Sequence, residues 1–280
     1  MEELAGKVAV VTGASSGIGR GIAFALAADG MRLVLADLDT PGLCAAGAEL
    51  RASGAAAIEV TTDVRDSSAV ESLAAAALDA YGAVHVLCNN AGVWTLGRQW
   101  ETDLADWQWV IDVNLWGAVH GVRTFVPLLL KNPDGGHIVN VSSIGGLMSG
   151  PLTGPYSASK HAIVGLSKGL RAELSRMGSR VGVSVVCPGT VQSAILDNVG
   201  KRPGLPGDPV LTPDAQAVAD AMRRAGSPAI SAREAGQLVR DAIRSGTFWV
   251  LPGAEAHLAL LENEHAELLQ AFASTPPGAP

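Results

Sequence analysis

Short apolar segments alternate with longer segments of helical periodicity along most of this 280-residue chain, and this alternation restricts its fold more than any other feature. Several of the short segments are almost entirely apolar, as expected for strands that are covered on both faces. Strands that alternate with helices favour parallel pairing through right-handed crossovers. We therefore predict an α/β fold: a doubly wound parallel sheet of about seven strands with helices on both faces. The segments that predict strands are 7–12, 32–37, 56–61, 84–89, 137–142, 181–187 and 247–251, and those that predict helices are 17–29, 41–53, 67–81, 103–130, 156–177 and 231–245.

The alternation extends almost to the end of the chain, so we predict a single domain over residues 1–273. Residues 189–230 interrupt it and are rich in proline and glycine. A loop of this length inside a domain is usually a lid or is disordered, so we expect a substrate lid or loop there. Residues 254–272 carry apolar residues at helical spacing and could either cap the domain or pack on another subunit. We expect residues 274–280 to form a flexible tail.

Composition and charge exclude several classes of protein. A net charge of −7 argues against nucleic-acid binding, which needs a basic surface. The N-terminal sequence MEELAGKVAVVTG lacks the basic region and the long apolar run of a signal peptide, and we expect no membrane span. The three cysteines are far apart and lack C-x-x-C spacing, so we expect neither disulfides nor a metal site, and a reducing, cytoplasmic setting.

A glycine-rich turn, VVTGASSGIGRGIA at 10–23, joins the first predicted strand to the first predicted helix. Glycine lets the backbone turn sharply and lets a pyrophosphate approach the amides at the start of a helix. Gly13, Gly17 and Gly19 have the spacing G-x-x-x-G-x-G, which differs from the strict G-x-G-x-x-G of many dinucleotide sites. The alternative is a plain turn without a ligand. We predict a dinucleotide site with hydroxyl donors from Ser15 and Ser16.

Asp37 ends the second predicted strand and indicates which dinucleotide binds. A carboxylate here can accept hydrogen bonds from both hydroxyls of an adenosine ribose, and it would repel a ribose phosphate. No arginine or lysine lies within 13–19 or 36–39 to attract that phosphate, so we predict NAD and regard NADP as less favoured. Asp37 could instead cap the helix that follows, but Asp39 and Thr40 are better placed for that role.

The chain has only two tyrosines, and one of them, Tyr156, lies four residues before Lys160. In a helix these side chains share one face, and the small residues between them leave room for a cofactor. Tyrosine has a pKa of about 10, and a neighbouring cation stabilises the phenolate and brings the pKa toward the range of a general base. The alternative is a packing tyrosine beside a solvated lysine. The glycine turn favours proton transfer, as does Ser143, which can hydrogen-bond to a substrate oxygen.

Seven short motifs follow one another in an order typical of one family: TGASSGIG (12–19), DV (63–64), NNAG (89–92), VN (113–114), SS (142–143), YSASK (156–160) and PG (188–189). With them the chain resembles the short-chain dehydrogenases/reductases over about residues 6–195. The resemblance implies a Rossmann-type fold and a catalytic set of Asn114, Ser143, Tyr156 and Lys160. In this set Asn114 would hold a water in line with Lys160.

The same resemblance assigns most of the cofactor contacts. The glycine turn would wrap the dinucleotide, and Asp63 and Val64 would border the adenine. Asn89, Ala91 and Gly92 would line the path from ribose to nicotinamide. Pro188 and Gly189, with Val191, would cover the nicotinamide. Because the family commonly forms dimers and tetramers, we expect a homo-oligomer built through helices such as 103–130 and 156–177. Together with the residues argued above, the expected cofactor-binding residues are Gly13, Ser15, Ser16, Gly17, Ile18, Gly19, Asp37, Asp63, Val64, Asn89, Ala91, Gly92, Tyr156, Lys160, Pro188, Gly189 and Val191.

The substrate side is expected to be apolar. Trp94 follows NNAGV and can form one wall of a pocket, which Met148, Leu152, Ile195 and Leu196 can complete. We therefore predict an NAD-dependent oxidoreductase that interconverts a hydrophobic secondary alcohol and its ketone. Two alternatives stay open: an NADP-preferring carbonyl reductase of the same fold, and a dinucleotide-binding regulatory protein without catalysis.

Overall fold

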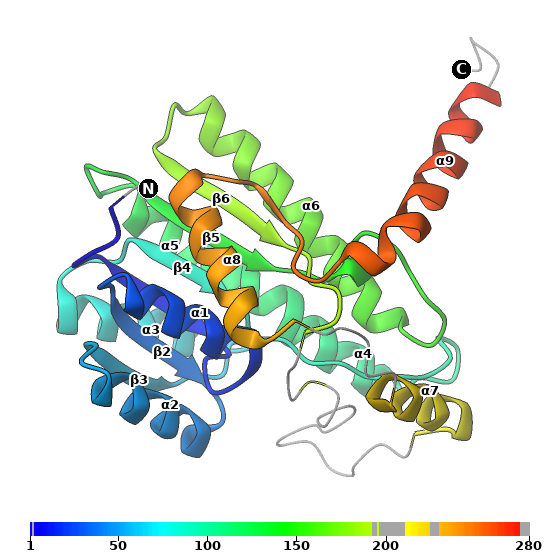
Figure 1. Ribbon diagram of the computed structural model, residues 1–280, viewed down its shortest axis with the longest axis horizontal. Helices are drawn as coiled ribbons and strands as arrows, with labels where there is room; N and C mark the ends of the chain where they lie inside the picture. The colour runs from blue at the N-terminus through cyan, green and yellow to red at the C-terminus, as the bar shows by residue number, and fades with distance from the viewer. Residues whose placement is uncertain (2, 192–194, 196–210, 225–229, 275–280) are drawn as a thin grey trace.

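The computed structural model describes residues 1, 3–191, 195, 211–224 and 230–274. Within them, seven parallel strands form one sheet in the order β3-β2-β1-β4-β5-β6-β7 (Figure 1). Each strand overlaps a segment that the sequence predicted, and the doubly wound α/β fold is confirmed. The strands are β1 (Val8–Thr12), β2 (Arg32–Asp37), β3 (Ala57–Thr61), β4 (Val86–Asn89), β5 (Gly136–Val141), β6 (Val181–Val186) and β7 (Trp249–Val250).

The strand order fixes where a ligand can bind. β1 and β4 are neighbours, with Ala9 opposite Val86 and Val11 opposite Cys88. From β1 the chain winds outward to β3, and from β4 it winds in the other direction to β7. The connections therefore leave the carboxyl ends of β1 and β4 in opposite directions, which is where open α/β sheets bind their ligands.

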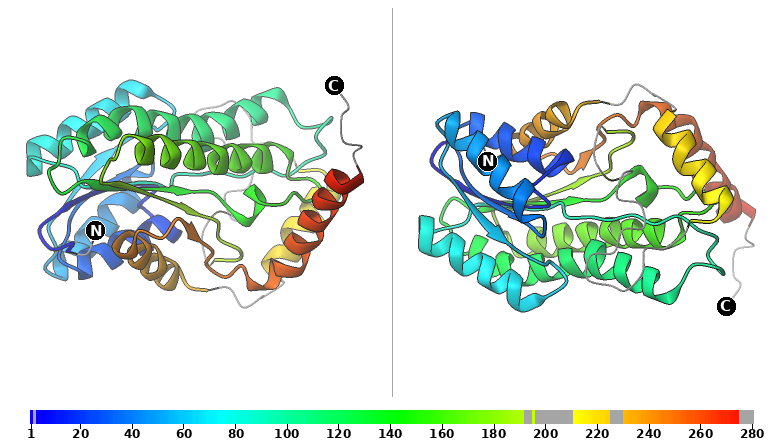
Figure 2. Two further views of the ribbon diagram at one scale, coloured as in Figure 1. Left: turned by 90° about the horizontal axis from the view of Figure 1, so that it is seen from above. Right: turned by 90° about the horizontal axis from the view of Figure 1, so that it is seen from below.

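Two layers of helices cover the sheet (Figure 2). Helices α1 (Gly17–Ala28), α2 (Thr40–Ala52) and α8 (Ala232–Ser245) lie on one face, where they bury side chains against β1, β2, β4 and β5. Helices α3 (Ser67–Tyr81), α5 (Gly117–Leu129) and α6 (Gly154–Arg176) cover the opposite face. The central strands are buried on both sides, which explains their almost uninterrupted apolar sequences.

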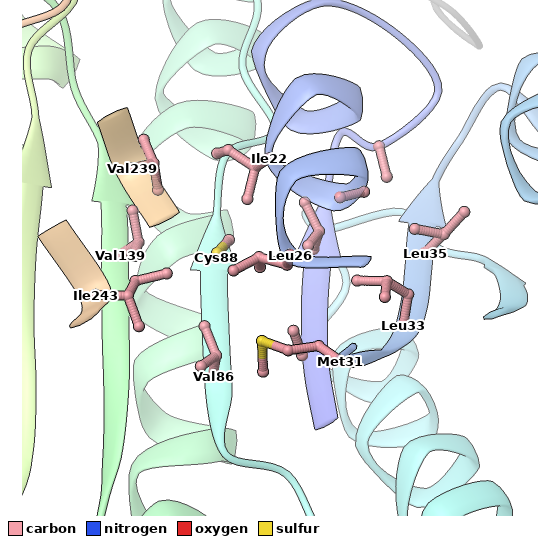
Figure 3. Packing of buried hydrophobic residues seen from close by; sticks show 14 of the residues in the cluster. Ile22, Leu26, Met31, Leu33, Leu35, Val86, Cys88, Val139, Val239 and Ile243 are labelled. Atoms are coloured by element: carbon pink, nitrogen blue, oxygen red, sulfur yellow. The ribbon is translucent and has the colours of Figure 1, made fainter. Parts of the chain in front are cut away.

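The α1–α8 contact is unusually close. Figure 3 shows Ile22 and Leu26 of α1 and Val239 and Ile243 of α8 packed together over the sheet. A Cβ atom added at Gly236 would clash with the backbone of Gly21. The two helices therefore pack backbone against backbone at this point, which only residues without a side chain allow.

The segment 103–130, which the sequence predicted as one helix, is interrupted. Helix α4 (Leu104–Ile111) passes into a π-helical turn, Asp112–Trp116, before α5 begins. The π turn carries the predicted site residue Asn114. Single π turns inside α-helices occur frequently at functional sites.

The segment 189–230 also differs from its prediction, because it contains a helix. Helix α7 (Pro213–Arg224) begins after Thr212, whose hydroxyl oxygen accepts a hydrogen bond from the amide of Ala215 (3.4 Å). Pro213 at the first helical position is favourable, since proline has no N–H to leave unpaired there. Most of the predicted loop, at 192–194, 196–210 and 225–229, lies outside the described residues.

Helix α9 (Leu258–Ser274) occupies the segment 254–272 that was predicted to be helical. It extends away from the rest of the protein and has no buried residue, so it does not cap the domain (Figure 1). The predicted tail, apart from Ser274, lies outside the described residues. Among the helices that the structure describes, none has both the length and the apolar character required of a membrane span.

Candidate active site

The glycine-rich turn is held in place by Asn90. Gly13 and Gly17 have positive φ angles of 66° and 51°, a conformation that favours glycine. The Asn90 Nδ2 donates to the carbonyls of Thr12 (2.8 Å) and Gly13 (3.1 Å). A Cβ atom at Gly13 would lie 2.7 Å from this nitrogen, so the turn and Asn90 fit only if residue 13 is glycine. Asn90 lies in the NNAG motif, but its role was not predicted.

The start of α1 is open to an anion. Its N-cap residue, Ser16, makes no hydrogen bond through its side chain to the helix amides. The first amides of an α-helix have no partner within the helix, so those of Gly17, Ile18 and Gly19 are available to a ligand. The turn therefore fits the pyrophosphate of a dinucleotide. Four other helices, α2, α3, α4 and α8, are instead capped by the side chains of Asp39, Asp66, Asp103 and Ser231.

Asp37 lies at the carboxyl end of β2, beside this turn. Its Oδ2 accepts from the amide of Ser15 (3.0 Å) and its Oδ1 from the amide of Asp39 (3.0 Å). Asp39 in turn caps α2 by accepting from the amide of Gly42 (3.3 Å). The two aspartates thus have separate roles, and the half-buried carboxylate of Asp37 remains near the turn.

The segment after β3 contains an ion pair that the sequence did not indicate. Arg65 donates to both carboxylate oxygens of Asp63, at 2.6 and 3.0 Å, and thereby lowers the pKa of Asp63. Val64 is buried, and its carbonyl lies 3.0 Å from Nδ1 of His120 on α5. Arg65 therefore holds the Asp63 side chain, and His120 holds the Val64 backbone, near the carboxyl end of the sheet.

Asn89 and Gly92, two of the residues predicted to line the path from ribose to nicotinamide, have different surroundings. The Asn89 amide is buried and donates to Oδ1 of Asn140 (2.9 Å), whose own Nδ2 donates to Oγ of Ser167 (3.0 Å). The Asn89 side chain is therefore part of a buried hydrogen-bond chain to β5 and α6, whereas we expected it to line the ribose path. A Cβ atom at Gly92 would lie 3.3 Å from Nζ of Lys160, so only a small residue leaves space beside this amine.

Tyr156 and Lys160 lie on the first turns of α6 and face the same region. Nζ of Lys160 is 5.7 Å from the centroid of the Tyr156 ring and donates to the carbonyl of Val141 (3.0 Å). Only 3% of Lys160 is exposed. A lysine of this kind is not a solvated surface residue, so the alternative reading of the pair does not describe its surroundings.

Ser143 is held against Tyr156 by the short turn that follows β5. Its Oγ accepts from the amide of Gly145 (3.0 Å), and a Cβ atom at Gly145 would lie 3.3 Å from Cε1 of Tyr156. The adjacent Ser142 has a different partner, because its hydroxyl donates to the carbonyl of Lys160 (2.8 Å). Ser143 therefore has the hydroxyl that faces the phenol, and Ser142 anchors the helix that carries it.

The pKa values of this pair differ from our expectation. Partial burial raises the pKa of Tyr156 above 10.0, although hydrogen bonding to Ser143 acts in the opposite direction. Burial also lowers the pKa of Lys160 from 10.5 to about 8. We expected the cation to lower the pKa of the phenol, but in the protein without cofactor the loss of hydration is the largest influence and raises it.

Asn114 is more constrained than we expected. Its Oδ1 accepts from the amide of Val93 (2.8 Å), and its Nδ2 donates to the Val93 carbonyl (3.0 Å) and to Oγ of Ser159 (3.0 Å). Both amide hydrogens are therefore used by protein groups, and the side chain fixes Val93 rather than presenting donors to a water. A cavity of about 10 Å³, near the lower limit for one water, lies beside it.

The predicted nicotinamide-side residues lie where β6 and β7 end. The Pro188 carbonyl accepts from the amide of Ile144 (2.8 Å), which ties this segment to the turn of Ser143. The Gly189 amide donates to the carbonyl of Pro252 (2.9 Å), and Val191 pairs with Ile230 in an isolated parallel bridge. The three residues therefore lie at the same edge of the sheet as Ser143.

Trp94 lies directly beside the catalytic tyrosine candidate. Its ring centroid is 5.3 Å from that of Tyr156, with 37° between the planes. Of the other predicted pocket residues, Leu152 packs with Trp94, and Leu196 lies outside the described residues. Buried Leu96, Ala215 and Ala219 form the centre of this apolar cluster, around which Trp94, Leu152, Leu211 and Val218 pack.

No group of three or more histidine, cysteine, aspartate or glutamate side chains in the described part of the chain could hold a metal ion. The candidate site therefore consists of the glycine-rich turn after β1, Ser143 after β5, and the half-buried Tyr156 and buried Lys160 of α6.

The chain is similar to known proteins. A family model described as short chain dehydrogenase matches residues 7–204. A 1-deoxy-11-beta-hydroxypentalenate dehydrogenase of Streptomyces avermitilis is 37% identical over 254 residues, which cover 90% of this chain and 86% of that protein. A C alpha-dehydrogenase of Sphingobium is 38% identical over 204 residues, covering 72% and 66%.

A solved structure extends the match over the whole chain. The short chain dehydrogenase/reductase from Burkholderia phymatum, crystallised in complex with NAD, is 41% identical, with a TM-score of 0.92, and the match covers 100% of this chain and 99% of that one. Its agreement with the present fold includes the sheet and the helices that carry the site. The chain therefore belongs to the short-chain dehydrogenase/reductase family of oxidoreductases.

Proposed function

We propose that this protein is an NAD-dependent oxidoreductase that interconverts an apolar secondary alcohol and its ketone. The observation that carries the proposal is the buried amine of Lys160 behind the Tyr156 ring, with the Ser143 turn against the ring's edge. Ser143 follows β5 and the open glycine turn follows β1, so both lie at the carboxyl edge of the same parallel sheet. A family relative from Sphingobium is itself named a C alpha-dehydrogenase.

In the direction of alcohol oxidation, Tyr156 accepts the proton of the substrate hydroxyl as general base. Ser143 donates a hydrogen bond to the same oxygen and stabilises the charge that develops on it. A bound NAD would supply the hydride acceptor, so that loss of a hydride from the carbinol carbon converts the alcohol to a ketone. In ketone reduction the same phenol returns a proton to the oxygen as general acid.

Lys160 and Asn114 support this chemistry in different ways. An ammonium group at Lys160 stabilises the phenolate form of Tyr156, and the Val141 carbonyl holds the amine at its place. Asn114 is a positioning residue, because it fixes the backbone of Val93 and the hydroxyl of Ser159 on α6. Its π turn thereby joins the NNAG segment to the helix that carries the tyrosine.

NAD is favoured over NADP by the charges around the turn. The carboxylate of Asp37 lies where it would repel a ribose phosphate, and Arg20 and Arg65 are already paired with Glu49 and Asp63. The Burkholderia relative was crystallised with NAD. Titration of the protein with NADH and NADPH tests this preference, and tighter binding of NADPH would contradict it.

The proposed chemistry is tested by replacing each of the two tyrosines with phenylalanine. Tyr156→Phe should reduce the turnover of ketones with NADH by at least about a thousandfold, because the phenol hydroxyl that protonates the ketone oxygen as general acid is lost. Tyr81→Phe is the matched control, since Tyr81 lies at the end of α3 and packs near Arg32. NADH affinity should stay within about twofold in both variants. Undiminished turnover by Tyr156→Phe would refute the assignment.

We further propose that the protein is a homo-oligomer. Three large apolar side chains are exposed along 104–130. They are Leu104 (82%) on α4, Trp116 (47%) on the π turn and Leu130 (40%) just after α5. Large apolar side chains that are exposed in this way favour subunit contact. Light scattering coupled to size-exclusion chromatography tests this, and a monomer at micromolar concentration would contradict it.

A further inference from the structure

Trp94 carries a polar atom that has no partner. Its indole Nε1 is shielded from solvent and makes no hydrogen bond within the described part of the chain. The ring itself is only half-buried. Buried donors are almost always paired in folded proteins, and an unpaired one is unfavourable until an acceptor arrives. An unpaired donor beside the candidate catalytic tyrosine is therefore a candidate for a hydrogen bond to the substrate.

The position of this donor is fixed relative to Tyr156. The preceding residue, Val93, is bound by Asn114 through both its amide (2.8 Å) and its carbonyl (3.0 Å). On the other side, Leu152 packs in the same cluster and has a φ angle of 66°, which leucine rarely adopts. The Leu152 carbonyl accepts from the amide of Gly97 (2.9 Å), which stabilises this conformation. Trp94 is thus held between two anchored segments, 5.3 Å from the Tyr156 ring.

The surroundings of the donor indicate that its acceptor is uncharged. The cluster around Trp94 consists of leucine, alanine and valine side chains from the segment after β4, from the segment before α6, and from α7 and the residues just before it. Arg98, which follows Leu96 of this cluster by two residues, is already paired with Asp214 of α7 (3.0 Å) and with Glu101 (3.3 Å). A carboxylate on the substrate would lose its hydration among these apolar side chains, and Arg98 is not free to pair with it. A ketone, ester or ether oxygen needs only the one hydrogen bond.

We propose that Trp94 Nε1 donates a hydrogen bond to a neutral oxygen of the substrate, set apart from the carbon that reacts at Tyr156. The substrate class is then an apolar secondary alcohol or ketone with a second, uncharged oxygen acceptor, and not a plain hydrocarbon alcohol. This inference rests on the proposed function, because it takes Tyr156 as the reacting end of the site. It adds a specificity-determining residue and a chemical feature of the substrate.

The test uses pairs of ketones that differ only in the acceptor. Acetophenones carrying a methoxy group at the ortho, meta or para position are compared with those carrying an ethyl group at the same position, which has nearly the same size but accepts no hydrogen bond. The full chain, saturated with NAD, is titrated with each ketone. The indole N–H signals of its six tryptophans are followed by proton–nitrogen correlation spectroscopy. The variant Trp94→Phe identifies the Trp94 signal and removes the donor while keeping an aromatic ring.

At one ring position, the methoxy compound should bind roughly three- to tenfold more tightly than its ethyl partner, as expected for one neutral hydrogen bond. It should also move the Trp94 N–H signal downfield, and the preference should disappear in Trp94→Phe. Trp100→Phe, in which an 81% exposed tryptophan is changed in the same way, should keep the preference. With NADH, kcat/KM for each pair should follow the same pattern.

Three results would overturn the inference: equal affinity for the two members of every pair, a preference that survives in Trp94→Phe, or no binding of any of these ketones. Failure of the proposed function is a separate outcome. It would appear as undiminished turnover in Tyr156→Phe, whatever the Trp94 signal does.

Discussion

Lys160 provides a quantitative prediction, because its amine is buried in the cofactor-free protein. Burial lowers the pKa of this group from 10.5 to about 8. Each pH unit of such a difference corresponds to about 1.4 kcal/mol, so the burial of this group costs about 3 kcal/mol of stability below about pH 8, where the amine is protonated in both the folded and the unfolded protein. The variant Lys160→Met removes the titrating group and keeps an unbranched side chain.

The sign of the effect follows from proton binding. Above about pH 8 the amine of the folded protein loses its proton, while the unfolded chain keeps it up to about pH 10.5. Between these values the unfolded state binds more protons, so a rise in pH favours the folded state. Relative to Lys160→Met, the free energy of unfolding of the wild type should therefore increase by about 3 kcal/mol from pH 8 to pH 10.5.

Urea unfolding of both proteins without cofactor, at several pH values in this range, measures the difference. Only the difference is informative, because the thiols of Cys88 and Cys187 and the phenol of Tyr156 have raised pKa values and destabilise both proteins at high pH. The lost hydrogen bond to Val141 adds an offset that does not change with pH. A difference that is the same at every pH would show that the amine is hydrated in the folded protein and would refute the reasoning.

Three further predictions concern packing, cofactor choice and the last helix. Gly236→Ala should lower the free energy of unfolding by about 1–3 kcal/mol, because its Cβ would meet the Gly21 backbone. Gly165→Ala, in open space on α6, is the control and should leave stability unchanged or increase it. Urea unfolding measures both variants, and equal effects would contradict the close α1–α8 contact. Asp37→Ala should shift the ratio of NADPH to NADH affinity toward NADPH by at least about tenfold, as measured by fluorescence titration; an unchanged ratio would remove Asp37 from cofactor choice. Deletion of 258–280 should leave the urea midpoint of the remaining protein unchanged, because no residue of α9 is buried, and a large decrease would mean that α9 is packed in solution.

The strands were predictable because each is short, apolar and covered on both faces. Segments such as VAVV at 8–11 have little alternation, and burial on both sides explains it. The glycine turn and the Tyr156–Lys160 spacing were also readable, since both depend on residues close together in the sequence. Local physics fixes these features, and the fold retains them.

Other features depend on contacts between distant segments and could not be predicted. The π turn at Asn114 is fixed by bonds to Val93 and Ser159, which are remote in sequence. The segment 103–130 itself has the periodicity of a single helix, so its sequence does not indicate the interruption. The raised pKa of Tyr156 depends on burial, and an i, i+4 spacing does not reveal how much water remains around a side chain.

Helix α7 was missed because the proline- and glycine-rich residues before it dominated the interpretation of 189–230. Its stability comes in part from the burial of Ala215 and Ala219 against Leu96, a contact across more than a hundred residues of chain. The role of Asn90 was missed for a similar reason. An asparagine that clamps a turn 77 residues earlier leaves no local signal.

The most direct test of the account is the ionisation of Tyr156 itself, followed by tyrosinate absorbance. In Tyr81→Phe, Tyr156 is the only tyrosine, so its titration can be measured alone. Without cofactor its pKa should lie above 10.0. With saturating NAD, whose nicotinamide ring is positively charged, the pKa should fall well below 10.0, into the range of a general base. A phenol that stays protonated up to pH 10 in the NAD complex would contradict the role of Tyr156 as the base.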